Sequence, residues 1–249
     1  MAKRAPDGWF ENIKTIVYAV LIAVGIRTVA FEPFNIPSGS MIPTLEIGDY
    51  LFVSKYTYGY SRHSFPYSPN LFSGRIFGGD PQRGDVAVFK WPGDNRTDYI
   101  KRIIGLPGDT VQVRVGQLYL NGKIVSRVAA EAVTSEEGGG RLVMSRRYVE
   151  TLPGGVVHDI QKHHDFGDMN NTPEFKVPAG MLFVMGDNRD SSADSRAPTS
   201  HLGVGFMPIE NLVGRAEFIF FSIRPGNPWW EVWMWPFDIR WGRIFSGIH

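Results

Sequence analysis

A short polar segment, residues 36–45, carries two serines between two prolines. Pro37 and Pro43 restrict the backbone on either side, while Gly39 permits a sharp turn. Such a rigid loop would present Ser38 and Ser40 as a nucleophile and an oxyanion donor require. An ordinary Ser/Gly loop has the same composition. The catalytic interpretation therefore also requires a second group that activates one of the hydroxyls.

Lys101 is the candidate for that group. In an extended strand, Tyr99, Lys101 and Ile103 lie on one face, which leaves the amine between two apolar neighbours. Such surroundings disfavour the charged form, so the pKa of Lys101 should fall. A neutral amine can accept the proton of a serine hydroxyl. The alternative is a solvated lysine at a strand edge.

A third segment, residues 186–196, has a single apolar side chain and cannot be core. Its aspartates and arginines indicate a hydrogen-bonded turn. A calcium loop is the competing interpretation, but Arg189 and Arg196 disfavour a dication and no bidentate glutamate closes the loop.

The composition excludes several classes of function. The 249 residues include no cysteine, which excludes disulfides, thiol catalysis and thiolate metal sites. The formal net charge of +1 lacks the basic excess of a nucleic-acid binder, so we expect no nucleic-acid partner. His158, His163 and His164 invite a metal hypothesis, but no acidic ligand is clearly placed with them. We expect neither a metal nor another cofactor.

Residues 13–31 are expected to form a transmembrane helix that anchors the rest of the chain. The 19 residues approach the roughly 20 that cross a bilayer core. The basic N-terminal residues predict a cytoplasmic tail over residues 1–12 and translocation of everything after Phe31. A cleavable secretory signal ending near Ala30 and a buried core helix are the alternatives.

The rest of the chain has the pattern of a β protein. The 28 glycines and 17 prolines, without a periodic repeat, favour short strands and turns. We expect strands at 86–91, 110–115, 181–185 and 216–223, and a hairpin around Asn121 and Gly122. No helix is expected beyond the anchor. The predicted domains are a catalytic β domain over 32–112 and 179–249, and an inserted β subdomain over 113–178.

The chain resembles a bacterial type I signal peptidase. The resemblance rests on six segments in this order: the anchor, the serine segment, residues 48–55, the lysine segment, the aspartate-rich turn and residues 211–216. The resemblance implies a mostly β fold: a single N-terminal transmembrane helix, then an antiparallel β-sheet catalytic domain with a smaller inserted β subdomain. Better-known members have two spans, and residues 197–203 intervene where the family often has an aromatic residue and glycine.

By resemblance, Ser40 is the nucleophile and Lys101 the general base. Ser38 would join the backbone N–H of Ser40 in the oxyanion hole, and Ser192 would orient Lys101. Asp194 and Arg196 would hold the turn as an ion pair. The residues that match the family's shallow substrate pockets are Phe34, Ile36, Met41, Leu45, Tyr99 and Ile100.

The implied activity is removal of signal peptides from secreted preproteins after Ala-x-Ala sites. The partners would be signal peptides and the lipid bilayer, with the translocation machinery as a further candidate. The implied location is the bacterial inner membrane, with the N-terminus cytoplasmic and the catalytic domain on the periplasmic side.

Three rival interpretations remain open. Another Ser-Lys protease of related fold, such as a self-cleaving repressor, would use the same dyad, although the anchor and the lack of a DNA-binding module disfavour it. A Ser-His-Asp hydrolase would combine Ser40 with His201 and an aspartate between 187 and 194. A non-enzymatic, anchored β domain would bind extended peptides and leave them intact.

Five of the seven tryptophans lie in the last 21 residues. Tryptophan favours the headgroup layer of a membrane, so this tail could lie in the outer leaflet. Aromatic packing against the β core is the equal alternative.

Overall fold

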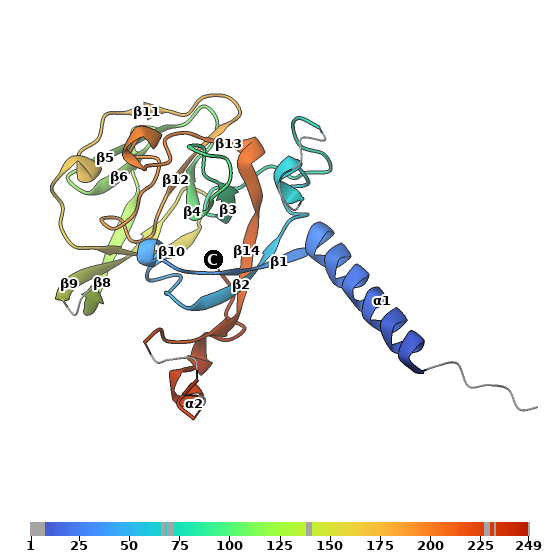
Figure 1. Ribbon diagram of the computed structural model, residues 1–249. Helices are drawn as coiled ribbons and strands as arrows, with labels where there is room; N and C mark the ends of the chain where they lie inside the picture. The colour runs from blue at the N-terminus through green and yellow to red at the C-terminus, as the bar shows by residue number, and fades with distance from the viewer. Residues whose placement is uncertain are drawn as a thin grey trace, which may run out of the picture.

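The computed structural model describes residues 8–65, 68, 72–137, 141–226, 230–231 and 233–248, and consists mainly of three antiparallel sheets (Figure 1). Helix α1, Gly8–Val29, projects from this β body. The expected mostly β architecture is therefore confirmed.

Helix α1 differs from the predicted anchor at both ends. Residues 8–12, expected as a tail, are helical, with Glu11 in the first turn where a negative charge favours the helix dipole. Residues 1–7 of that tail lie outside the described residues. Within the described part of the chain, no helix has the combination of length and apolarity needed to span a membrane, so the predicted transmembrane helix is not confirmed.

The largest sheet has seven strands in the order β1-β2-β14-β3-β4-β12-β13. Its inward side chains, among them Leu51, Val53 and Val88, are buried in a common core because successive residues of a strand face opposite sides. The strands are β1 Phe31–Asn35, β2 Asp49–Ser54, β14 Leu212–Ser222, β3 Val86–Lys90, β4 Asp98–Gly105, β12 Met181–Met185 and β13 Met207–Pro208.

A second sheet has four strands in the order β11-β5-β6-β7. Strands β6, Gln117–Leu120, and β7, Lys123–Ile124, form the predicted hairpin. Asn121 and Gly122 both have positive φ, as a tight hairpin turn of that type requires. The other strands are β5 Thr110–Arg114 and β11 Phe175–Lys176.

The third sheet, β10-β9-β8, lies wholly within residues 113–178. It comprises β8 Ser126–Glu137, β9 Arg141–Thr151 and β10 Val157–Lys162. We call these three strands the inserted sheet. The division into a catalytic domain and an inserted subdomain stays a prediction, and β5 crosses its boundary at residue 112.

The expectation of no helix beyond the N-terminal one is wrong in one place. Helix α2, Trp235–Asp238, forms a single turn near the C-terminus, with Pro236 inside that first turn, where a missing N–H is tolerated. The predicted strands at 86–91, 110–115, 181–185 and 216–223 are all present, with end points that differ by up to four residues.

Candidate active site

Ser40 and Lys101, which are 61 positions apart in sequence, meet in the structure. Ser40 lies in a short 3-10 turn, Gly39–Met41, just beyond β1, and Lys101 lies on β4. Lys101 Nζ donates a hydrogen bond to Ser40 Oγ at 2.8 Å. The serine segment and the lysine segment thus form one site.

The surroundings of Lys101 favour a neutral amine. Its side chain is buried, with a second hydrogen bond to the carbonyl of Ile100 at 2.8 Å. Burial lowers the pKa of Lys101 to about 8, and the charges of Asp194 and Asp187 only partly oppose this effect. At slightly alkaline pH the amine can therefore accept a proton from the hydroxyl beside it.

The third predicted segment, residues 186–196, lies directly beside this pair; we call it the aspartate turn. Arg196 Nη2 and Asp194 Oδ2 form a buried ion pair at 2.8 Å, as expected. Burial alone would raise the pKa of Asp194, but Arg196 and the N–H of Gly186 hold it below its usual range. The carboxylate stays ionised and holds the turn closed.

The two other predicted serines have different surroundings. Ser38 is exposed at the start of the 3-10 turn and lines the cleft beside Ser40. Ser192 is buried, and no described residue hydrogen-bonds its hydroxyl; Lys101 Nζ bonds to Ser40 and Ile100 instead. A Cβ added to Gly186 would meet both Ser192 Oγ and the Ser40 carbonyl oxygen. The Ser192 hydroxyl therefore lies next to the Ser40 backbone.

A cleft of about 570 Å³ opens over the pair. Of the six predicted pocket residues, four line it: Phe34, Ile36, Tyr99 and Ile100. The prediction is wrong for Met41 and Leu45, which are 0% exposed and belong to the hydrophobic core. The turn around Ser40 directs these two side chains inward, so they support the floor of the site.

Two strand edges form the walls of this cleft. Strand β1 is at the end of its sheet, and among the described strands it pairs only with β2. On β4, residues 98–101 pair with β3 on one side, whereas β12 pairs only with residues 102, 103 and 105 on the other. The two free edges face the cleft and could each pair with an extended peptide.

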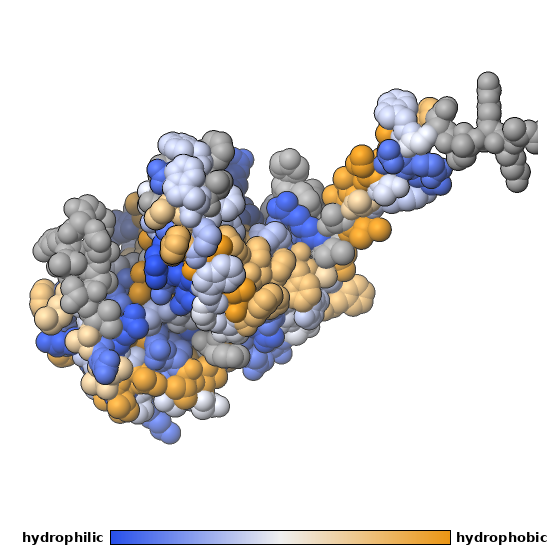
Figure 2. All heavy atoms as spheres, turned by 90° about the horizontal axis from the view of Figure 1, so that it is seen from below, coloured by the Kyte–Doolittle hydropathy of each residue, from blue (hydrophilic) through white to orange (hydrophobic). Residues whose placement is uncertain are grey.

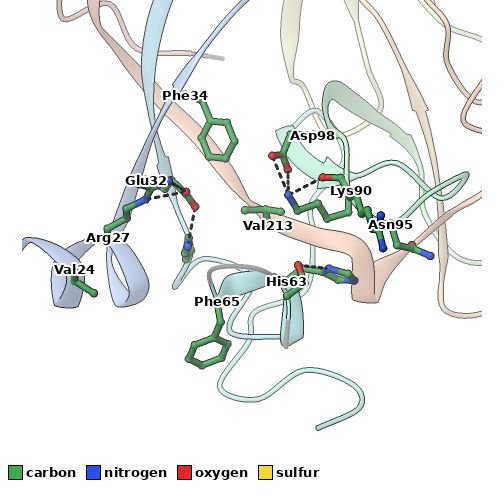
Figure 3. Close-up of a pocket in the computed structure, with 13 residues that line it drawn as sticks. Val24, Arg27, Glu32, Phe34, His63, Phe65, Lys90, Asn95, Asp98 and Val213 are labelled. Carbon is green, nitrogen blue, oxygen red and sulfur yellow. Dashed lines mark hydrogen bonds and ion pairs between the residues drawn. The ribbon is translucent and has the colours of Figure 1, made fainter. Parts of the chain in front are cut away.

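A second cleft, of about 600 Å³, is lined by residues that include Val24 and Arg27 near the end of α1 (Figure 3). Phe34 and Asp98 line both clefts. Its charges are largely paired: Lys90 Nζ lies 2.8 Å from Asp98 Oδ1, and Glu32 contacts both Arg27 and Lys55. The two clefts together form an extended groove that starts at Ser40.

Several positioning residues were not predicted from the sequence. Arg102 follows Lys101 on β4, and its guanidinium binds both oxygens of Asp187 at 2.8 and 2.7 Å. Burial opposes ionisation of Asp187, but Arg102 holds the pKa of Asp187 below its usual range. Thr44 donates to the same carboxylate. The sequence did contain a signal for Arg102: it directly follows Lys101, so on a strand its charged side chain must face the opposite side.

None of the histidines that the structure describes lines the cleft at Ser40. His201 is exposed in the 3-10 turn Thr199–His201 and is not among the residues that line the cleft. The described residues contain no group of three or more His, Asp or Glu side chains arranged to hold a metal ion.

Comparison of the sequence with known proteins finds signal peptidases. The family model for "Signal peptidase, peptidase S26" matches residues 9–221. A signal peptidase I of Rickettsia canadensis is 40% identical over 96% of this chain and 93% of its own, and that of Rickettsia akari is 37% identical over 99% and 94%. A crystal structure of a signal peptidase I from Enterococcus faecalis, 29% identical, covers 55% of this chain and 97% of that chain with a TM-score of 0.32.

Proposed function

This chain belongs to the S26 family of signal peptidases, and on that basis we propose that Ser40 is its nucleophile and Lys101 its general base. Family membership makes it a serine endopeptidase that removes signal peptides. The observation that supports the dyad is the 2.8 Å hydrogen bond between the buried amine of Lys101 and the Ser40 hydroxyl.

In the proposed mechanism, neutral Lys101 accepts the proton of Ser40 Oγ while that oxygen bonds to the scissile carbonyl carbon. The Ser40 backbone N–H and the Ser38 hydroxyl stabilise the resulting oxyanion. When the C–N bond breaks, Lys101 returns the proton to the leaving amine. The signal peptide then remains as an ester on Ser40, and Lys101 activates the water that hydrolyses it.

Ser192 remains the proposed orienting group for Lys101. Its hydroxyl lies next to the Ser40 backbone and has no hydrogen-bond partner among the described residues. A buried hydroxyl without a partner costs free energy, so a change of side-chain rotamer toward the amine would be favourable.

The substrate is proposed to bind as an extended strand between the free edges of β1 and β4. Main-chain hydrogen bonds would supply affinity, and the apolar walls formed by Ile36 and Ile100 would select small side chains before the scissile bond. These walls fit the Ala-x-Ala preference. Residues farther toward the N-terminus of the signal peptide would continue past Phe34 into the second cleft.

Helix α1 is proposed to attach the enzyme to the membrane. Its apolar side chains, among them Ile16, Leu21 and Ile22, are exposed along a helix that projects from the β body (Figure 2). Burying such surface in lipid is favourable because it leaves water. Attachment would bring the groove, which runs from Ser40 to the end of α1, to the membrane surface where signal peptides emerge.

The direct test is incubation with a preprotein that carries an Ala-x-Ala site. The wild type should release the mature protein with its N-terminus directly after the second alanine, as mass spectrometry would detect. Ser40→Ala should leave the preprotein intact, whereas replacing an exposed serine of β8, Ser126→Ala, should preserve cleavage.

The same assay separates the rival interpretations. Lys101→Ala should abolish cleavage, and His201→Ala should be tolerated; the reverse pattern would indicate a Ser-His-Asp hydrolase. A peptide-binding domain would leave the preprotein intact even in the wild type. Specific cleavage of the chain itself, with no cleavage of the preprotein, would indicate a self-cleaving relative.

A further inference from the structure

The inserted sheet contacts the aspartate turn through buried polar side chains, a feature that the proposed mechanism does not use. Glu150 of β9 is fully buried and accepts from both Nη atoms of Arg189, one of them at 2.9 Å. Strand β10 adds backbone bonds, because Gln161 N donates to Asp187 O and Arg189 N to Gln161 O, each at 2.9 Å. Residues 187–189 are thus paired to the inserted sheet like a short parallel strand.

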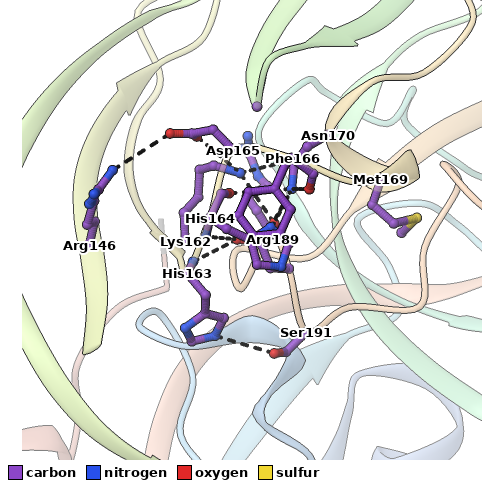
Figure 4. Close-up of polar contacts among 12 residues, drawn as sticks. Arg146, Lys162, His163, His164, Asp165, Phe166, Met169, Asn170, Arg189 and Ser191 are labelled. Atoms are coloured by element: carbon purple, nitrogen blue, oxygen red, sulfur yellow. Dashed lines mark hydrogen bonds and ion pairs between the residues drawn. The ribbon is translucent and has the colours of Figure 1, made fainter. Parts of the chain in front are cut away.

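Further contacts hold the same turn farther along (Figure 4). Asp190 accepts backbone hydrogen bonds from His163 and His164, at 2.7 and 3.2 Å, and a side-chain bond from Asn170. Lys162 Nζ lies 3.3 Å from the same carboxylate. Residues between 150 and 170 therefore hold the turn at Arg189 and Asp190.

On its other side, the turn holds the peptide groups around Ser40. Asn188 lies between the two residues that the inserted sheet binds. Its backbone N–H donates to the Ser40 carbonyl, and its side-chain Nδ2 donates to the Gly39 carbonyl, both at 3.1 Å. Asn188 is almost completely buried, so these bonds are shielded from water.

The bond to Gly39 matters because of peptide geometry. The Gly39 carbonyl and the Ser40 N–H belong to one planar peptide unit, in which they point in opposite directions. Fixing the carbonyl therefore fixes the direction of the N–H. That N–H is the proposed oxyanion donor, and such donors act through accurate placement toward the charge that develops in the transition state.

We propose that Asn188 is a positioning residue for the Ser40 N–H, and that Glu150 of the inserted sheet holds Asn188 in place through Arg189. This inference rests on the proposed function, and it gives the inserted sheet a role in catalysis without any contact to substrate. The path runs from Glu150 to Arg189, along the backbone to Asn188, and across hydrogen bonds to residues 39 and 40.

Two variants test the two ends of this path. Asn188→Ala removes the bond to the Gly39 carbonyl. Combining Glu150→Met with Arg189→Met removes the buried ion pair without leaving an unpaired charge, which avoids the destabilisation that either single change would cause. Arg146→Gln is the matched control, since Arg146 is exposed on the same strand as Glu150 and forms its ion pair with Asp165, which lies outside the turn.

The expected result is a fall in kcat with an unchanged KM, because the N–H acts on the transition state and not on bound substrate. Losing an oxyanion donor costs about 100- to 1,000-fold, so misplacing one should cost about 10- to 100-fold. The pH at which activity rises should stay that of the wild type, since Lys101 keeps its surroundings. Arg146→Gln should match the wild type in all three quantities.

A kcat within twofold of the wild type for Asn188→Ala would overturn the inference, as would a loss confined to KM or a shift of the pH midpoint. If the double variant fails to fold, the kinetics of Asn188→Ala decide alone. The backbone amide resonance of Ser40 gives a readout independent of cleavage: it should move in Asn188→Ala and stay in Arg146→Gln. Failure of the proposed function would appear separately, as an inactive wild type or an active Ser40→Ala.

Discussion

Lys101 is a buried amine held between the hydroxyl of Ser40 and the carbonyl of Ile100. Both neighbours can be satisfied by a neutral amine, and burial in the protein disfavours the ammonium form. The residue that would be a simple surface cation on most strands is therefore suited here to accept a proton.

The pH dependence of cleavage should follow the titration of Lys101. Because the pKa of Lys101 is lowered to about 8, the neutral fraction increases as pH rises through that value. We expect kcat/KM to rise about tenfold per pH unit below pH 8 and to level off above it. A profile measured from pH 6 to 10 checks this, and Lys101→Arg, which stays charged throughout, should lack the activity.

A flat profile over that range would contradict the role of Lys101 as base. A midpoint near pH 6.5 would instead point to a histidine.

Gly186 is predicted to be intolerant of any side chain. A Cβ at this position would overlap Ser192 Oγ and the Ser40 carbonyl, well inside van der Waals distance. Gly186→Ala should therefore displace the backbone of Ser40 and lower kcat at least about tenfold, since small displacements at a reacting centre are costly. Gly242→Ala, where a Cβ meets nothing within 4 Å, is the matched control. Equal activity of the two variants would contradict the close packing at Gly186.

Residue types raised Ser40 and Lys101 as candidates, because a serine between prolines and a lysine between apolar neighbours are unusual, but the pairing of the two came from the family resemblance. They could not show which neighbours of Ser40 face the cleft. Met41 and Leu45 lie in a segment without regular periodicity, so nothing in the pattern distinguishes an inward from an outward side chain. Asn188 was equally invisible, because its partners are carbonyl groups far away in the sequence.

At the level of elements, the site is formed by two strands of the seven-stranded sheet, the end strand β1 and the inner strand β4, together with two turns. Strand β4 has two different parts: residues 98–101 leave an edge open to the cleft, while residues 102, 103 and 105 pair with β12. The change of partner along one strand is what places Lys101 at the end of an open edge. Alternating hydrophobicity predicts the strands, but it does not show at which residue the pairing of one strand with its neighbour stops.

The interface between the inserted sheet and the aspartate turn should make the protein sensitive to acid. His158 of β10 is buried, with Nε2 at 3.5 Å from Glu150 and 4.0 Å from Asp187. Burial lowers the pKa of His158 to about 4, because Arg102 and Arg189 already pair with these two carboxylates and offset their attraction. The folded protein therefore keeps this imidazole neutral.

The sign of the effect follows from linkage. In the unfolded chain His158 takes up a proton near pH 6.5, whereas in the folded protein it does so near pH 4. The free energy of unfolding should thus fall as pH drops from 6.5 to 4, by at most about 3 kcal/mol from this residue. Urea titrations at several pH values check this, and His158→Gln should reduce the slope.

His63 has a similarly lowered pKa, so part of the slope should persist in that variant. An unchanged slope in His158→Gln would show that His158 does not contribute.

Across the whole molecule, helix α1, the groove and the C-terminal residues are connected to one another through β1 and the serine segment. Helix α1 leads directly into β1, which forms one wall of the cleft. The C-terminal residues are bound to the serine segment, because Arg243 pairs with the buried Asp49 at 2.6 Å and donates to the Thr44 carbonyl at 3.0 Å. Helix α1 and the C-terminal residues are therefore both connected to segments that form the cleft.

Membrane attachment should have two separable contributions. In the proposed arrangement, the apolar side chains of α1 would provide the first, and the exposed tryptophans near the C-terminus, Trp233 at 65% and Trp235 at 44%, would provide the second. Tryptophan favours the headgroup layer, whereas aliphatic side chains favour the hydrocarbon. Leu21→Glu with Ile22→Glu should therefore remove most of the binding, and Trp233→Ala with Trp235→Ala a smaller part.

Flotation of the full chain with phospholipid vesicles measures both effects, and Leu202→Ala, an exposed apolar residue of neither surface, is the control. Loss of binding in the α1 variant alone would assign attachment to the helix and leave the tryptophans to packing against the β body. Wild-type flotation of the α1 variant would contradict the proposed role of the helix. If the tail also orients the cleft, Trp233→Ala with Trp235→Ala should lower kcat/KM on vesicle-bound preprotein while a short soluble peptide is cleaved at the wild-type rate.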